Sequence, residues 1–465
     1  RSWGTSGPVH VSFGGQAGWY TPFNKAWPKA FEVLNQPSIG DPLSGESSGP
    51  FQNPGTIHGQ TRQRSHAGVA YYNDEVAKRP NLRVVTEVMV EKVLFEKGDD
   101  SSITATGVLA TTADGIKRTI PAAREVILAA GALNTPKILE LSGIGDARLL
   151  QPLGIDVLVN NPNVGENFQD HGFVAFSWEV AGPQSSSDCV REPDVRDALM
   201  QLYQNGGAGP LGVQSLASSF LPVPDVGELD ALLHRYLDDD EKSYNKQFPA
   251  KQRQYELLRE LLLKPGEPSS QTTFAPFQIS PQRGPSLKKI FGMQEPGEYV
   301  SIATALNYPF SRGSVHIQSA DPQQKPGLDL GLLSHPLDLE LHARQVLWAE
   351  KIAQTGPFAV LLKKDGRRLH LPTSTSTSTS TSTPIDLETA KKLTTERILP
   401  HYHASGTCAM MPRELGGVVD DRLTVYGTTN VRVVDASVFP LIPRGNIQTD
   451  VYAVAEGAAD IIAQQ

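Results

Sequence analysis

The clearest hydrophobic pattern along the chain is a short unbroken apolar run, Val126–Ala130, which ends at Gly131. Runs of this length without polar interruption are typical of strands that are buried on both faces, as in a parallel sheet. Thr135-Pro136 then offers a helix cap followed by proline at the first helical position, so we expect a helix over Lys137–Leu141. A strand, a glycine and a helix in this order indicate an α/β fold.

Strand-forming residues upstream of that run predict a different arrangement. They occupy Leu82–Thr86 and continue through Phe95, and they return over Thr106–Thr112 and Ile116–Ile120. A turn at residues 113–115, Ala-Asp-Gly, separates the last two segments. Together these segments predict a meander of short antiparallel strands.

The α/β pattern returns near the C-terminus. Val431–Asp435 is typical of a strand that ends in an acid, and residues 443–446, Pro-Arg-Gly-Asn, lead into a last helix. The apolar positions of this helix recur at close to helical spacing: Val451, Val454, Ala455, Ala458 and Ile462.

The remaining segments carry weaker periodic signals. Residues 1–60 predict loops around one helix, Pro22–Leu34, and Ser65 is placed to cap a helix that carries Ala67. Residues 172–400 mix polar, proline-punctuated loops with expected helices over Asp194–Gln204, Glu228–Leu237, Ala250–Leu263 and Leu337–Gln354. Thr and Ser alternate over residues 373–383, which predicts a solvent-exposed loop.

The composition narrows the classes of function. The formal net charge of −8 argues against a nucleic-acid partner, because Lys and Arg drive phosphate binding. No apolar run approaches the roughly 18 residues that span a membrane. Cys189 and Cys408 are too far apart to form a disulfide scaffold. No Asn-x-Ser/Thr acceptor supports secretion, and the chain begins at Arg1 without a signal-like segment, so localisation stays unknown.

Residues 207–212, Gly-Ala-Gly-Pro-Leu-Gly, fit the GxGxxG spacing of a dinucleotide-binding turn. That motif needs a strand before it and a helix that opens after it. Here an expected helix precedes the motif and Pro210 lies inside it, so we interpret the segment as a loop. Spacing alone therefore gives the chain no complete nucleotide-binding fingerprint.

His401 and His403 lie two residues apart, ahead of a run of small residues and Cys408. On a strand both rings would point to one face, as in some metal sites, but no further His, Asp or Glu falls nearby at ligand spacing. Isolated histidines are more often core residues than functional ones, yet histidine is also the side chain best suited to take a proton near neutral pH. The pattern by itself leaves a metal site, a proton-transfer site and a core role open.

Seven sets of residues, in order along nearly the whole chain, resemble motifs of the glucose-methanol-choline (GMC) flavin oxidoreductases. They are Arg64–Ala67, Glu125–Ala132 with Leu141–Gly145, Asn163–His171, Gly209–Leu211, His403–Met410 with Gly417–Asp420, Val434–Ser437 and Asn446–Glu456. Residues 172–400 match least. The chain starts downstream of the family's GxGxxG unit and of its first signature. We expect a fragment of a longer protein rather than a truncated gene product, because the remaining strands would otherwise leave an open sheet edge.

The resemblance implies an α/β fold, α+β overall, with two parts. One is a Rossmann-like FAD-binding domain with a β-meander, and the other is a substrate domain of antiparallel sheet and helices. Residues 1–80 would be mixed loops and helices that link the two domains, and 81–171 would belong to the FAD-binding domain. Residues 172–400 would form the substrate-binding domain, and 401–465 the active-site block with the C-terminal FAD-binding part.

The resemblance also implies the chemistry, which is oxidation of a primary or secondary alcohol by hydride transfer to flavin N5. By motif position, His403 would be the general base that receives the hydroxyl proton, while His401 would stay a core histidine. Asn446 would be the partner that hydrogen-bonds and orients the substrate oxygen.

Five residues would bind the FAD in this reading. Asn446 and Ile447 lie at the start of the last helix, whose positive end would stabilise the negative charge of reduced flavin. Asp435 and Ala436 would lie beside the ribityl or pyrophosphate part, and Val90 would contact the adenine through its backbone.

The resemblance leaves partners and activity partly open. The expected partners are a small-molecule alcohol and either oxygen or another electron acceptor, and a homodimer is compatible with them. One alternative is an FAD-containing non-redox cyclase or lyase of the versicolorin B synthase type, in which His403 could serve as acid and base. A second alternative is an inactive, flavin-free fragment.

Overall fold

The computed structural model describes residues 4, 6–17, 21–41, 44–45, 48–98, 102–182, 186–227, 229–237, 249–281, 284, 286–369 and 385–464. The Thr/Ser segment 373–383, for which a loop is predicted, lies outside these ranges. Within them, no helix combines the length and the apolarity needed to cross a membrane.

The largest sheet has six antiparallel strands in the order β1-β9-β10-β11-β8-β14. These strands are Gly49–Gln52 (β1), Gly172–Glu179 (β8), Ala217–Leu221 (β9), Ser270–Ala275 (β10), Tyr299–Leu306 (β11) and Leu399–Pro400 (β14). Because Pro400 pairs with Gly172, the chain after β14 runs beside the chain before β8. This pairing brings residues 401–403 next to residues 170–171.

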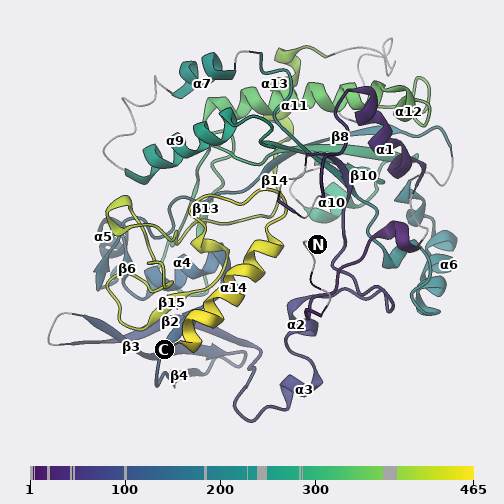
Figure 1. The fold of residues 1–465 in the computed structure, drawn as a ribbon. Coiled ribbons are helices and arrows are strands. Elements are labelled where there is room, and N and C mark those ends of the chain that lie inside the picture. The colour runs from purple at the N-terminus through teal and green to yellow at the C-terminus, as the bar shows by residue number, and fades with distance from the viewer. Residues whose placement is uncertain are drawn as a thin grey trace.

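Helices cover one face of the six-stranded sheet (Figure 1). They are Pro22–Val33 (α1), Pro336–Gln354 (α11), Gly356–Ala359 (α12) and Leu387–Arg397 (α13). Large side chains fill the space between the two layers: Phe23, Trp27, Phe31, Phe176, Trp178, Phe274, Val346 and Phe358. Each contributes roughly 1.5–3 kcal/mol through burial of apolar surface, which makes this layer the main core. Phe173 and Ala175 of β8 point to the opposite face, where a smaller cluster forms.

Further helices lie outside this layer. They are Ala67–Ala70 (α2), Asp74–Ala77 (α3), Ala147–Leu150 (α5), Pro193–Gln204 (α6), Leu229–Leu237 (α7), Pro249–Leu263 (α9) and Leu287–Phe291 (α10). The helices predicted near residues 22–34, 194–204, 228–237, 250–263 and 337–354 are therefore confirmed to within a residue or two. Residues 207–212 form a loop that ends in a 3-10 turn, as predicted.

The predicted α/β elements and the meander gather at the other end of the molecule (Figure 1). The parallel pair is Val126–Leu128 (β5) with Val431–Val433 (β15), and Gly131–Leu141 (α4) follows β5. The meander consists of Val88–Lys97 (β2), Ile103–Thr112 (β3) and Lys117–Pro121 (β4). Two smaller pairs are Ile144–Gly145 (β6) with Val159–Asn160 (β7), and Ser314–His316 (β12) with Gly327–Asp329 (β13). The last helix, Gln448–Ala463 (α14), extends from the large sheet toward the meander.

Two predictions of strands at this end need correction. Leu82–Thr86 forms no strand, and Val84 and Val85 are 55% and 70% exposed. Strand-forming residues make a strand only where a neighbouring strand pairs with them, and no described strand pairs with these. The run at 126–130 contributes only three residues to β5, and Ile127 is 44% exposed, because β15 is the one described strand that pairs with β5.

Two predictions of helix starts are also wrong. The helix after β5 begins at Gly131, so Pro136 lies inside it rather than at its first position. The cap residue of α2 is His66, and the Ser65 hydroxyl accepts the backbone N–H of His10 instead. In both cases the predicted capping hydroxyl hydrogen-bonds a group outside the helix.

Candidate functional site

The structure brings His403 and Asn446 together. The side-chain Nδ2 of Asn446 lies 3.2 Å from Nε2 of His403. Asn446 is exposed and lies two residues before α14 begins, whereas His403 is only 8% exposed. One edge of the buried imidazole therefore faces the start of the last helix, which is the convergence that the motif positions predict.

The residues just before β8 support the two histidines. The carboxylate of Asp170 accepts the backbone N–H groups of His401, at 3.0 Å, and of His403, at 3.2 Å. The ring of His171 meets the ring of His403, with 2.9 Å between the two Nδ1 atoms. The other nitrogen of His171, Nε2, lies 3.3 Å from the backbone oxygen of Asn307, at the end of β11. Asp170 thus fixes the backbone of His403, and His171 contacts its ring.

Gln169 ties the same segment to the loop that carries Asn446. Its backbone exchanges two hydrogen bonds with Ser405, each of 3.0 Å. Its side-chain oxygen accepts the N–H of Ile442 at 3.1 Å, and its amide nitrogen donates to the carbonyl of Pro440. Residues 169–171 therefore hold both sides of the site, which are far apart in the sequence.

Burial controls the protonation of these groups. It lowers the pKa of His403 to about 4, and it also lowers the pKa of His171 well below the ordinary value. Burial also raises the pKa of Asp170 to about 7, against the opposing effect of the backbone N–H groups that point at its carboxylate. Both histidine rings are consequently neutral at pH 7.

His401 has a different environment from His403. Its ring packs between Phe173 and His403, with 5.0 Å and 4.4 Å between centroids, and its buried Nδ1 has no hydrogen-bond partner among the described residues. Burial lowers its pKa to about 3. Across the described ranges, no group of three or more His, Cys, Asp or Glu side chains is placed to hold a metal ion. Cys189 and Cys408 carry free thiols.

Asp435 and Ala436 connect the site to the first turn of α4. One carboxylate oxygen of Asp435 accepts the N–H of Gly131, at 2.9 Å, and the hydroxyl of Thr135, at 2.6 Å. The carbonyl of Ala436 accepts the N–H of Gly406 at 3.1 Å. Because the Asp435 carboxylate already has these donors, its side chain serves to join β15 to α4. This role explains why Thr135 does not cap a helix at Pro136.

Pro136 has a second consequence inside α4. Proline has no N–H, so the carbonyl of Ala132, four residues earlier, lacks its helical donor. The hydroxyl of Thr407 donates to this carbonyl at 2.7 Å, and Thr407 is completely buried. The segment that follows His403 is thus fixed to α4 through Thr407, four residues after the histidine.

The start of α14 is the place where the motif positions predict the edge of the flavin. Its cap residue, Ile447, makes no side-chain capping hydrogen bond, and the first turn carries one acid, Asp450. The Ile447 side chain is buried against Phe439 and Ile442, so only its backbone is available to a ligand. A side chain at Gly131 would meet nothing within 4 Å, which leaves open space at the start of α4, next to Asp435.

Val90 is not joined to this part of the site. It lies in β2, half-buried, next to a register shift in the pairing with β3. No hydrogen bond links it to His403 or Asn446 within the described part of the chain. An adenine contact at Val90 therefore stays a prediction.

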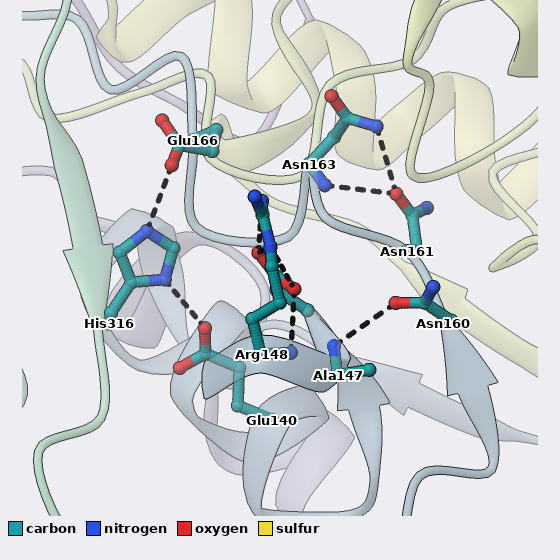
Figure 2. Close-up of polar contacts among 9 residues, drawn as sticks. Glu140, Ala147, Arg148, Asn160, Asn161, Asn163, Glu166 and His316 are labelled. Carbon is teal, nitrogen blue, oxygen red and sulfur yellow. Dashed lines mark hydrogen bonds and ion pairs between the residues drawn. The ribbon is translucent and has the colours of Figure 1, made fainter. Parts of the chain in front are cut away.

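A partly buried charged cluster includes Glu166, in the segment before Gln169 (Figure 2). His316 of β12 lies between two carboxylates, with Nδ1 2.7 Å from Glu140 of α4 and Nε2 3.2 Å from Glu166. Burial lowers the pKa of His316, but the hydrogen bonds to the two carboxylates outweigh it and raise that pKa to about 9. The cationic imidazole therefore links α4, β12 and the 163–171 segment at neutral pH.

A cavity of about 200 Å³ lies beside the same segment. Its lining includes Asn167, Arg312 and Gly406. Neither His403 nor Asn446 lines it, so it is separate from the site at the start of α14.

The sequence motifs drew attention to residues 163–171 without giving any of them a role. The structure assigns contacts at the site to three of these residues, Gln169, Asp170 and His171, and also to Asn307. An acidic residue followed by histidine just before a buried apolar strand was the available signal, since Asp and His are rarely buried without a partner. Asn307 carried no such signal.

Comparison with known proteins gives a consistent family. The family model "GMC oxidoreductase" matches residues 6–173 with its N-terminal part and 309–455 with its C-terminal part. A dehydrogenase of Monascus purpureus, mpl7, is 33% identical over 99% of this chain and 72% of its own length. The GMC oxidoreductase family protein Mala s 12 of Malassezia sympodialis is 32% identical over 99% of this chain and 68% of its own.

Solved structures agree with the sequence comparisons. An FAD-dependent oxidoreductase from Chaetomium thermophilum superposes with a TM-score of 0.83 at 25% identity, covering 99% of this chain and 74% of its own. A fungal aryl-alcohol oxidase superposes with a TM-score of 0.79 at 26% identity, over 99% and 73% of the two chains. The chain therefore belongs to the GMC oxidoreductase family and is an FAD-dependent oxidoreductase.

Proposed function

We propose that the protein oxidises a primary or secondary alcohol to the carbonyl compound, with His403 as the general base and Asn446 as the residue that orients the substrate oxygen. The observation that carries this proposal is the 3.2 Å contact between Nε2 of His403 and the amide of Asn446 at the start of α14. The contact brings a titratable ring and a hydrogen-bond donor side by side.

The two residues divide the work. The hydroxyl proton of the alcohol passes to Nε2 of His403, while the amide of Asn446 donates to the substrate oxygen and holds its carbon in place. FAD, when bound, supplies the acceptor for the hydride that leaves the same carbon. The substrate thus loses one proton and one hydride, and its C–O single bond becomes a carbonyl. The N–H groups at the start of α14 would face the flavin and would favour negative charge there.

The protonation state of His403 supports this role. Because burial lowers its pKa to about 4, the ring is an unprotonated acceptor across the neutral range. We expect kcat/KM to be flat from about pH 5 upward and to fall as the pH approaches 4, where the imidazole becomes protonated before substrate arrives.

The test is anaerobic reduction of the flavin by substrate, measured as loss of the visible flavin absorbance. The panel of candidate substrates would include an aryl alcohol, because an aryl-alcohol oxidase is among the structural neighbours. It would also include formate, because a formate oxidase superposes with a TM-score of 0.77 at 28% identity. The rate at which the reduced flavin is reoxidised is then compared between air and an artificial dye. Fast reoxidation in air indicates an oxidase, and reoxidation by the dye alone indicates a dehydrogenase.

Two histidine variants make the test specific. His403→Ala removes the base, so we expect flavin reduction to slow by about 10²–10⁴-fold while the flavin stays bound. His401→Phe is the matched control, because it keeps a ring against both Phe173 and His403 and removes no contact with Asn446. Substrate that is converted without bleaching would indicate a non-redox cyclase instead. Equal rates in wild type and His403→Ala would overturn the assignment of the base.

A further inference from the structure

His403 can act as a base only if the nitrogen that faces the substrate carries no proton. A neutral imidazole has one proton, and its position is set by the hydrogen bond that the other nitrogen makes. The nitrogen that faces Asn446 is Nε2, so Nδ1 must hold the proton. A neighbouring group must therefore accept a hydrogen bond from Nδ1 of His403.

The proton of His171 is fixed by its own surroundings. Nε2 of His171 lies 3.3 Å from the backbone oxygen of Asn307, and a carbonyl oxygen can only accept a hydrogen bond. Nε2 of His171 must therefore carry a proton. The ring is 1% exposed, and burial lowers its pKa well below the ordinary value, so it holds a single proton. Nδ1 of His171 is consequently a bare acceptor.

The contact between the two rings then has only one consistent direction. The two Nδ1 atoms are 2.9 Å apart, a hydrogen-bond distance that requires one proton between them. Since Nδ1 of His171 is bare, Nδ1 of His403 donates. A continuous chain results, in which the amide of Asn446 donates to His403, His403 donates to His171, and His171 donates to the carbonyl of Asn307.

We propose, on the basis of the function proposed above, that His171 is a positioning residue that sets the tautomer and the orientation of the base. It keeps the proton of His403 on Nδ1, so that Nε2 is free to receive the hydroxyl proton of the substrate. When that proton arrives, the bond to His171 becomes charge-assisted and stronger, which stabilises the imidazolium. His171 takes up no proton in this step, because its own proton stays on Nε2, which donates it to the carbonyl of Asn307.

Asn307 extends this support to the other side of the site. Its side-chain oxygen accepts the N–H of Gly445 at 3.3 Å, and its amide nitrogen donates to Pro268 at 2.7 Å. Gly445 directly precedes Asn446. One buried residue at the end of β11 therefore fixes His171 through its backbone and the neighbour of Asn446 through its side chain.

Two variants of nearly equal shape isolate the acceptor on residue 171. In His171→Asn the side-chain oxygen takes about the place of Nδ1, so an acceptor for His403 remains. In His171→Leu the same branched shape carries no acceptor. Both variants lose the bond to Asn307, so the difference between them reports the bond to His403 alone.

The kinetic readout is the rate of anaerobic flavin reduction and its pH dependence. We expect His171→Leu to lower kcat by about 10²-fold with little change in KM, because the base is misoriented or protonated on the wrong nitrogen. Its low-pH limb should also move to lower pH, because the imidazolium has lost its acceptor. His171→Asn should stay within about tenfold of wild type in kcat. Equal kcat values for the Leu and Asn variants would overturn the proposal.

A second readout needs no substrate and no turnover. In the wild-type protein labelled with ¹⁵N-histidine, the two ring nitrogens of each histidine differ in chemical shift according to which one carries the proton. The His403→Ala and His171→Asn variants assign the signals. We expect His403 with its proton on Nδ1 and His171 with its proton on Nε2.

The two readouts separate this inference from the proposed function. A proton on Nε2 of His403 would overturn the inference even if the enzyme oxidises alcohols. If His403→Ala abolishes flavin reduction but both His171 variants equal wild type, His403 remains the base and the positioning role is refuted. If no alcohol reduces the flavin, the proposed function fails, and the tautomers still decide whether His171 orders this ring.

Discussion

Thr407→Val is expected to destabilise the protein because of a proline in another element. Pro136 lies inside α4 and cannot donate to the carbonyl of Ala132, so the hydroxyl of Thr407 supplies that hydrogen bond at 2.7 Å. Valine keeps the shape of threonine and removes only the donor. A buried carbonyl left without a partner costs about 1–3 kcal/mol, and we expect the free energy of unfolding to fall by that amount.

Thr394→Val is the matched control. Thr394 is also completely buried, and its hydroxyl donates to the carbonyl of Ala390 at 2.9 Å. Ala390 and Thr394 lie four residues apart in α13, so this carbonyl also has the ordinary helical N–H donor. Removing the hydroxyl leaves no unpaired carbonyl there, and the expected fall in the free energy of unfolding is at most about 1 kcal/mol.

A third variant tests the physical reason directly. Pro136→Ala restores an N–H opposite the carbonyl of Ala132, so in that background Thr407→Val should cost no more than the control does. Urea unfolding of the four chains in the double-mutant cycle measures the coupling. The reasoning is refuted if Thr407→Val and Thr394→Val cost the same in the wild-type background, or if Pro136→Ala leaves the cost of Thr407→Val unchanged.

Three further predictions concern buried polar groups. Asp170→Ala leaves two backbone N–H groups without an acceptor, so we expect the free energy of unfolding, measured in urea, to fall by about 2–6 kcal/mol. Asp170→Asn should cost less, because it keeps an oxygen that can accept, and equal losses for the two variants would contradict this. His316→Gln leaves the fully buried Glu140 without its cationic partner, and we expect the free energy of unfolding to fall by about 3 kcal/mol. A second change, Glu140→Gln, should relieve this loss. Strictly additive losses in the double variant would be evidence against the pairing. Burial lowers the pKa of His342 to about 4, so the unfolded chain binds more protons between pH 4 and 6.5 and stability falls as the pH falls through that window. His342→Leu should remove about 3 kcal/mol of that decline, and an unchanged slope of stability against pH would show that His342 does not cause it.

Local sequence patterns predicted most of the helices and strands, and family motifs identified the two residues that meet at the site. The helices near residues 22–34 and 337–354 and the strands at 126–128 and 431–433 all lie where the sequence predicts them. His403 and Asn446 were found by their positions in motifs. Their contact is a matter of tertiary structure, and the structure provides it.

The failures of prediction have a common physical cause. Val84 and Val85 have the composition of a strand, but composition does not reveal whether a neighbour pairs with them. Thr135-Pro136 has the composition of a helix start, but Asp435, 300 residues away, takes the threonine hydroxyl. In each case the deciding partner is distant in the sequence, and a single sequence carries no periodic signal for such a contact.

The contacts that hold His403, the proposed base, are also distant in the sequence. β14 is only two residues long, so its pairing with β8 holds the chain before His403 weakly. A shift of that pairing by one residue would turn alternate side chains to the other face and move the ring away from Asn446. The hydrogen bonds from residues 401 and 403 to Asp170, and from His403 to His171, oppose such a shift, because they fit only the observed register. The position of His403 therefore depends on these buried polar side chains more than on the short strand that precedes it.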